Sequence, residues 1–210
     1  MKKNLGFLVL VGLLLALGGC SREHSAVKQT LHTQLNGKPC VVVLTQGADP
    51  VRLYSADGKL LWKGLPPRSE NPWKIQVGDV DGDGRDEIGI GVYKKAKFHP
   101  VMAKRPFIYG WDGKKLYPKW LGSRLSRPFT DFVLANFGGS AAKLVAIEET
   151  SDGMNELAVY GWNGFGFTRE WNGAQAKKLS ELGVCGSEIK VAGKTYIWNG
   201  RGLKKVTSNQ

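Results

Sequence analysis

The chain has 210 residues, with 30 lysines and arginines against 18 aspartates and glutamates, giving a formal net charge of +12. That length can bury one sizeable core, and the charge favours anionic partners such as lipid headgroups or acidic polymers, unless it serves solubility alone. No nucleic-acid-binding motif is present, so we expect no nucleic acid among the partners. Glycine at 28 positions and short apolar runs between turn residues predict an all-β protein.

The first residues have the features of an export signal. Two lysines precede an apolar run over residues 5–17, which is shorter than a membrane-spanning helix prefers. The segment Leu17-Gly18-Gly19-Cys20 resembles the lipobox of bacterial lipoproteins, which implies cleavage before Cys20 and lipidation of that residue. An ordinary cleaved signal is the alternative. Ser21 implies, by the same resemblance, the outer membrane of a Gram-negative cell, or otherwise the outer face of the cell membrane.

These features divide the chain into three parts. We expect a lipoprotein signal peptide over residues 1–19, a lipidated tether over 20–26 and one domain over 27–207. Loss of the signal peptide leaves 28 basic and 18 acidic residues, a balance of +10. The expected location is the cell envelope, with the membrane as a partner through the lipid anchor.

A four-fold internal repeat organises the domain. Each copy has a Tyr three residues before Asp-Gly or Asn-Gly, a dipeptide that predicts a type I′ hairpin turn with positive φ at both residues. The copies end at Gly58, Gly113, Gly164 and Gly200, and three are followed by a Trp, at Trp62, Trp120 and Trp171. Reading outwards from the turns gives units over roughly 27–66, 69–122, 125–173 and 174–207.

Four units of up to four antiparallel strands predict a small β-propeller of about four blades. We favour a closed ring over an open arc that needs a partner or a second copy of the chain to complete it. Cys40 lies in the first unit and Cys185 in the last. In an oxidising compartment a disulfide between them would tie the ring shut, and two free thiols are the alternative.

An acidic loop lies in the second unit. From Asp79 to Glu87, acidic side chains occupy relative positions 1, 3, 5 and 9, and glycines occupy positions 4 and 6. Alternate carboxylates supply the oxygen ligands that a hard cation such as Ca²⁺ requires. Position 12 is Ile90 and both flanks read as strands, so the loop is not an EF-hand.

The run from Val77 to Ile88 resembles the calcium loop of FG-GAP/VCBS repeats, the blades of integrin-α-type β-propellers. The resemblance implies one structural Ca²⁺ and the following ligands: the side chains of Asp79, Asp81, Asp83 and Glu87 and the backbone carbonyl of Arg85. The third unit has Leu134 to Ser140 in the corresponding place without the ligand carboxylates, so we expect a single metal site.

The most cationic stretch runs from Lys94 to Arg105 and is predicted to be a loop, with Phe98 and Met102 as apolar contacts. Together with a second basic stretch, over residues 123–129, it could form an anion site, or it could be an ordinary solvated loop. The candidate residues are Lys94, Lys95, Lys97, Lys104, Arg105, Arg124 and Arg127.

No catalytic motif is present, and we expect Glu148 and Glu149 to lie on a solvated rim. The sequence therefore predicts a non-enzymatic, calcium-stabilised binding or assembly module with a protein partner or an anionic glycan or lipid partner. The alternative is a carbohydrate-binding or polysaccharide-acting surface protein, in which Trp73, Trp111 and Trp162 would stack on sugars rather than pack between blades.

Overall fold

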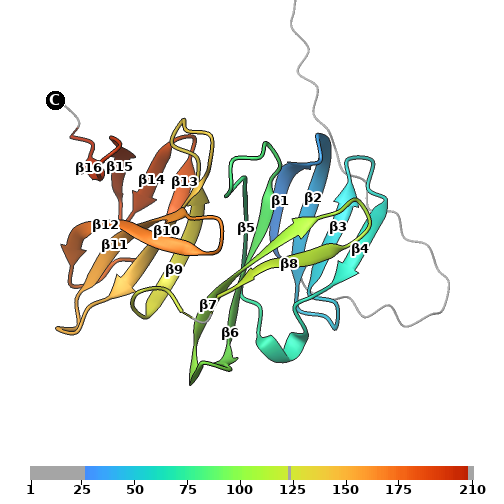
Figure 1. Cartoon of the computed structure of the whole chain (residues 1–210), viewed down its shortest axis with the longest axis horizontal. Helices are drawn as coiled ribbons and strands as arrows, with labels where there is room; N and C mark the ends of the chain where they lie inside the picture. The colour runs from blue at the N-terminus through green and yellow to red at the C-terminus, as the bar shows by residue number, and fades with distance from the viewer. Residues whose placement is uncertain (1–26, 123, 208–210) are drawn as a thin grey trace, which may run out of the picture.

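The computed structural model describes residues 27–122 and 124–207, and its regular structure is almost entirely β-strand (Figure 1). Four antiparallel sheets follow one another along the chain, and we call them blades 1 to 4. Blade 1 contains β1 (Val27–Leu35), β2 (Lys38–Thr45), β3 (Val51–Ser55) and β4 (Leu60–Gly64). Blade 2 contains β5 (Lys74–Gly78), β6 (Glu87–Ala96), β7 (His99–Trp111) and β8 (Leu116–Leu121), after the short 3-10 helix η1 (Arg68–Glu70).

Blades 3 and 4 repeat this order. Blade 3 contains β9 (Phe129–Ala135), β10 (Lys143–Glu149), β11 (Asn155–Trp162) and β12 (Phe167–Ala176). Blade 4 contains β13 (Gly183–Cys185), β14 (Glu188–Val191), β15 (Lys194–Trp198) and β16 (Leu203–Lys205). Each sheet keeps its strands in sequence order, so the all-β prediction of four four-stranded propeller blades is confirmed.

The repeated Tyr-to-Gly segments form the turns between the third and fourth strands of each blade. The turn glycines Gly58, Gly113, Gly164 and Gly200 have φ between 84° and 94°, whereas the preceding Asp or Asn does not have positive φ. The expected type I′ geometry is therefore wrong. Asn163, for example, accepts N–H bonds from Phe165 at 3.0 Å and Gly166 at 2.8 Å, so the Asx side chain caps a longer turn.

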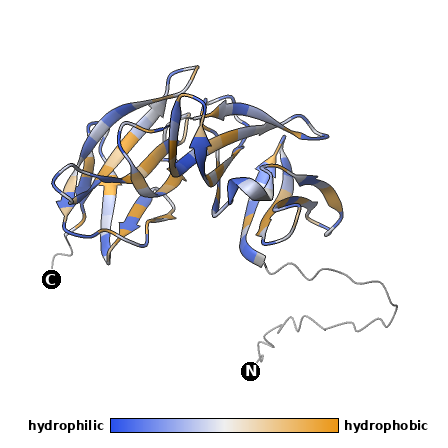
Figure 2. Cartoon of the chain, turned by 90° about the horizontal axis from the view of Figure 1, so that it is seen from below, coloured by the Kyte–Doolittle hydropathy of each residue, from blue (hydrophilic) through white to orange (hydrophobic). Residues whose placement is uncertain are grey.

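Three clusters of buried apolar side chains hold the blades together, and each lies between two consecutive blades. A ring of four blades requires four such interfaces. In the described part of the chain no cluster joins blade 4 to blade 1, so the closed ring that we favoured is not formed through a core interface. Figure 2 shows the blades following one another along an arc.

Side chains link the innermost strands near the points where those strands begin. The amide of Gln29 in β1 makes two 2.9 Å hydrogen bonds with the backbone of Ile75 in β5. Lys74 in β5 pairs at 2.6 Å with Asp131 in β9. The inner strands therefore run in parallel, and we call the side where they begin the lower face. The acidic loop and the turns between third and fourth strands lie on the opposite side, the upper face.

The two cysteines of the described chain are both free, so the expected disulfide is wrong. Cys40 is buried in the cluster between blades 1 and 2, whereas Cys185 is exposed at the end of β13. The physical reason is that Cys40 points into a core interface on one end blade, while Cys185 faces solvent on the other.

Candidate metal centre and cationic arm

The acidic loop connects β5 to β6, and Asp79 organises its backbone. Asp79 Oδ1 accepts the N–H of Gly82 at 2.7 Å and of Asp83 at 3.2 Å, and Oδ2 accepts the N–H of Gly84 at 2.7 Å. Gly82 and Gly84 both have positive φ, which lets the chain curl around this carboxylate. The spacing of the sequence motif thus fixes the turn through local hydrogen bonds.

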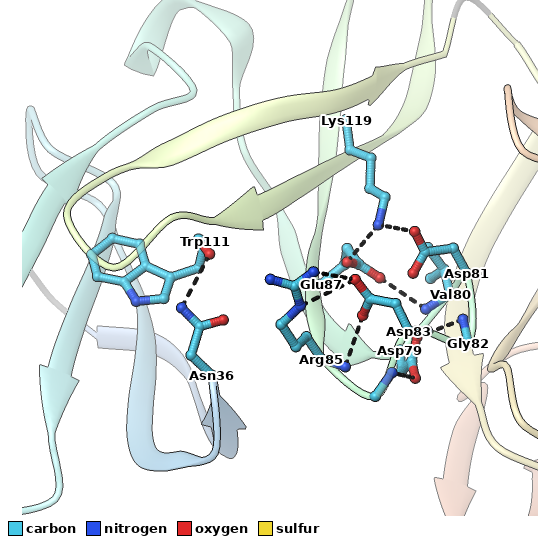
Figure 3. A network of polar contacts seen from close by, with 11 residues as sticks. Asn36, Asp79, Val80, Asp81, Gly82, Asp83, Arg85, Glu87, Trp111 and Lys119 are labelled. Carbon is cyan, nitrogen blue, oxygen red and sulfur yellow. Dashed lines mark hydrogen bonds and ion pairs between the residues drawn. The ribbon is translucent and has the colours of Figure 1, made fainter.

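Glu87 closes the other end of the loop. Its side chain is buried, and Oε2 accepts the backbone N–H of Val80 at 2.9 Å. Oε1 accepts a 2.8 Å hydrogen bond from Nζ of Lys119, and the same ammonium forms an ion pair with Asp81 (Figure 3). Lys119 comes from β8, and sequence reasoning did not select it because nothing in the loop motif points to that strand.

Asp79, Asp81 and Glu87 form a cluster that could hold a metal ion, because one oxygen from each lies within 4.8 Å of the others. Their donor atoms are all carboxylate oxygens, which fits a hard cation. Asp83, a fourth expected ligand, is not a member of this cluster: it accepts the N–H of Arg85 at 2.9 Å and pairs with its guanidinium at 2.8 Å (Figure 3).

Burial and neighbouring charges shift the acid–base properties of these groups. Burial raises the pKa of Glu87, and the hydrogen bond from Lys119 opposes the rise only in part. Burial would lower the pKa of Lys119, but its hydrogen bonds to Asp81 and Glu87 outweigh that effect and raise the pKa. Lys119 therefore stays charged and neutralises the carboxylates.

The acidic loop also contacts blade 3. The N–H of Ala142 donates a 2.5 Å hydrogen bond to the carbonyl of Asp79, and Gly82 lies against Ser140. The segment between β9 and β10, which the repeat aligns with the acidic loop, is thus its direct neighbour. Ordering of the acidic loop is consequently coupled to the interface between blades 2 and 3.

The predicted cationic loop is instead a two-stranded arm, which we define as residues 92–105. The pairing of β5 with β6 ends at Lys74↔Gly91, and the pairing of β7 with β8 ends at Phe107↔Leu121. Past these pairs, β6 and β7 pair only with each other among the described strands. Figure 1 shows β6 and β7 reaching past the other strands at the bottom of the view. The arm therefore projects from the lower face.

Several of the predicted anion-binding residues are engaged in contacts within the protein. Arg105 is fully buried and donates to backbone carbonyls, so it faces no solvent anion. Lys94 pairs with Glu70, Lys104 donates to the carbonyl of Thr130, and Arg127 pairs with Glu156. Exposed members of the set are Lys95, Lys97 and Arg124.

Two carboxylates of blade 3 are buried, which corrects the expected solvated rim at Glu148. Glu148 and Glu156 lie opposite each other on β10 and β11 and are 0% and 1% exposed. Tyr160 Oη and Arg169 donate to Glu148, the latter at 3.2 Å. Glu156 accepts from Arg127, from Asn172 at 3.0 Å and from Gln175 at 3.3 Å. Glu149, one residue on, is exposed.

The tryptophans pack between blades as expected. Trp73 meets Phe132 of blade 3 edge to face at 5.9 Å, Trp162 packs on the cluster between blades 2 and 3, and Trp111 packs on the cluster between blades 1 and 2. Trp73 also borders a pocket of about 720 Å³ on the lower face. All four blades or their connections contribute to this pocket, through Gln29, Lys74, Asp131 and Glu181 among others.

No protein-family model matches the chain, and no curated protein matches its sequence. Among solved structures, the crystal structure of an exotype rhamnogalacturonan lyase is similar, with a TM-score of 0.51 and 13% sequence identity. The match covers 84% of this chain but 40% of the lyase chain. The likeness is one of fold alone. It agrees with the predicted propeller, while membership of the FG-GAP/VCBS family stays a prediction.

The residues expected to anchor the protein, the signal peptide and Cys20, lie outside the described residues. Within the described ranges, no helix has the length and apolar character needed to cross a membrane.

Proposed function

We propose that this chain is an envelope-anchored binding or assembly module, stabilised by one Ca²⁺ ion and without catalytic activity. The observation that carries the proposal is the convergence of Asp79, Asp81 and Glu87 at a loop whose carboxylates also bond its own backbone. A cation bound there would reinforce a turn of blade 2 and its contact with blade 3. Such a role is structural, because the ion would hold the scaffold that presents the surrounding loops.

The choice of Ca²⁺ follows from the ligand chemistry. Ca²⁺ accepts about six to eight oxygen ligands in flexible arrangements, whereas Mg²⁺ requires stricter geometry and keeps several waters. Three carboxylates, with water completing the shell, suit the larger ion. When bound, Ca²⁺ would supply the positive charge that Lys119 otherwise provides to Asp81 and Glu87.

The internal ionisable side chains favour a scaffold over an active site. Glu148 and Glu156 are each buried and bonded to neighbouring protein groups. Groups that are satisfied in this way stabilise a unique fold and are not poised to react with a ligand. The absence of a catalytic motif from the sequence points the same way.

The anchor and the exposed cations support an envelope role. The lipobox-like segment ending at Cys20 would tether the chain to a membrane, and Lys95, Lys97 and Arg124 remain available for an anionic partner. Two or more acyl chains anchor stably where one is marginal, so a lipidated Cys would suffice without a spanning helix.

Crosslinking of the full chain in native membranes, with Ca²⁺ or with a chelator, tests the proposal. We expect a defined partner that is recovered with Ca²⁺ and lost with the chelator. The double variant Asp79→Asn/Asp81→Asn should lose the partner under both conditions, while Asp57→Asn, at an exposed turn, should retain it. If the same amount of partner is recovered with Ca²⁺, with the chelator and from the double variant, the structural role of the ion is refuted.

Carbohydrate binding is the second candidate, and the lower-face pocket is the observation that favours it. Its lining combines the ring of Trp73 with the amide of Asn155 and the exposed carboxylate of Glu149. Such a mixture of an aromatic face with a few polar groups suits a polyhydroxylated ligand. The similar fold of a rhamnogalacturonan lyase is consistent with it. Titration with neutral oligosaccharides would decide, with Glu149→Gln expected to weaken binding because the carboxylate accepts hydrogen bonds from sugar hydroxyls; no binding across the panel would eliminate this candidate.

A further inference from the structure

The arm is an exposed projection whose tip is apolar. Phe98, Val101 and Met102 are 84%, 56% and 42% exposed. An isolated two-stranded hairpin is marginally stable in water, and exposed apolar side chains add to its cost. A projection of this kind needs both an internal support and an apolar contact.

The internal support comes from Arg105. Its Nε donates to the carbonyl of Lys94 at 2.8 Å, and Nη2 donates to the carbonyls of His99 at 3.0 Å and Val101 at 2.7 Å. At the base of the arm, the ammonium of Lys104 lies 4.3 Å from the ring centroid of Trp73. These contacts cross-link both strands of the arm and fix it to the blade, so its tip is held in a defined position.

The surface of the arm is amphipathic and carries one sign of charge. Lys95 and Lys97 flank the apolar tip, and both are exposed. The sequence from Ile88 to Trp111 contains no Asp or Glu. At a membrane surface, an aromatic ring enters the boundary of headgroups and acyl chains while lysine ammoniums stay among the phosphates.

The lower face is also where the described chain begins. Because Gln29 bonds the backbone of Ile75, the start of β1 lies beside the start of β5, on the side from which the arm projects. The segment from Cys20 to Val27 can span at most about 25 Å. The arm reaches about 17 Å beyond Gly91, at a strand rise of about 3.3 Å per residue. A lipid at Cys20 would therefore hold the arm within reach of the membrane.

We propose that the arm tip inserts into an anionic lipid surface and forms a second, reversible membrane contact beside the lipid anchor. This inference rests on the proposed function for the anchor, and it names the lipid surface as the anionic partner of Lys95 and Lys97. Two contacts on one face, the stable lipid anchor and the reversible arm contact, would orient the molecule, with the acidic loop and the upper-face turns directed away from the membrane.

Vesicle flotation tests the arm without the anchor. A chain of residues 21–210 keeps every strand and core residue described here, and we expect it to bind vesicles of phosphatidylglycerol and phosphatidylcholine but not phosphatidylcholine alone. Phe98→Ser should weaken binding at least about tenfold, from the lost burial of the ring. Lys95→Glu/Lys97→Glu should weaken it by a similar factor and reduce its salt dependence.

Matched controls come from the upper face. Phe165 is 87% exposed at the turn between β11 and β12, so Phe165→Ser removes an equally exposed ring from the opposite side. Lys114→Glu/Lys115→Glu makes the same change of charge at the turn between β7 and β8. Equal effects of the arm and control variants, or binding that ignores lipid charge, would overturn the proposal.

The anchor is tested separately by fractionating cells that express the full chain and its Cys20→Ala variant. If the full chain and the Cys20→Ala variant are found in the membrane fraction in equal amounts, the anchor is refuted. The flotation result for the arm is unaffected by that outcome. If fractionation shows anchoring through Cys20 but the arm variants of the 21–210 chain bind vesicles as well as the unsubstituted chain does, the arm contact alone is refuted.

Discussion

Nζ of Lys119 lies 2.8 Å from Oε1 of Glu87 and also pairs with Asp81, so a lysine from β8 provides the positive charge inside the acidic loop. Glu87 is 3% exposed, and a buried carboxylate is costly without a counter-charge. Lys119 and a bound cation are therefore alternative partners for the same oxygens.

Replacement of Lys119 by Met should make the fold depend on a metal ion. Without Ca²⁺, the loss of the ammonium leaves Glu87 buried and unpaired, and we expect a loss of roughly 3 kcal/mol in the free energy of unfolding. Saturating Ca²⁺ should restore most of it. Urea denaturation with and without a chelator measures both values. Lys143→Met, which breaks the more exposed pair with Glu170, should cost less than about 1 kcal/mol and ignore Ca²⁺; equal losses would contradict the assignment.

Stability should decline at alkaline pH because two tyrosines are buried. Burial first, and then the charge of Glu70, raises the pKa of Tyr109 to about 12; burial and the hydrogen bond to Glu148 do the same for Tyr160. An unfolded tyrosine has a pKa of 10.0, so between pH 10 and 12 the unfolded state loses protons that the folded state keeps. Stability is therefore lost as the pH rises through this window, by roughly 2–3 kcal/mol per tyrosine.

The variant Tyr109→Phe isolates one of these contributions. It removes the titrating hydroxyl and keeps the ring in the cluster between blades 1 and 2. We expect its urea midpoint to fall about half as steeply with pH as that of the wild type above about pH 10. An unchanged slope would show that Tyr109 is not protected from ionisation.

The interface between blades 3 and 4 should be sensitive at Gly202. A Cβ atom at this position would lie 2.5 Å from Nε1 of Trp171 in β12, so Gly202→Ala forces the indole to move. Overpacking of this kind costs about 1–3 kcal/mol, measured by calorimetry. Gly183→Ala is the control, since a Cβ there meets nothing within 4 Å. A smaller loss at Gly202 than at Gly183 would refute the close packing.

The two cysteines should respond differently to substitution. Cys185→Ser should leave both the free energy of unfolding and the non-reducing gel mobility unchanged, because the thiol is exposed and free. Cys40→Ser places a hydroxyl in the core cluster and should cost roughly 1–3 kcal/mol. Equal losses in the free energy of unfolding, together with a change in gel mobility, would support a disulfide between the two cysteines.

Local sequence patterns were sufficient for the blade repeat and for the acidic loop. The Tyr-to-Gly segments predict hairpins because the Asx side chain and the following glycine act within a few residues. Asp79 likewise caps N–H groups three to five residues away. The turn type was mispredicted because the Asx cap, which stabilises a longer turn, leaves no separate trace in the dipeptide.

The amino-acid sequence by itself determined the four units, the strands beside their turns and the curled acidic loop, since turn chemistry and alternation depend on neighbouring residues. The tertiary structure alone decided the partners that meet across strands and blades. It brings Lys119 to Glu87 from 32 residues away, buries Glu148 against Tyr160, and leaves blades 1 and 4 without a shared core. Such contacts depend on how whole sheets pack, because that packing determines which side chains lose water and must find a partner.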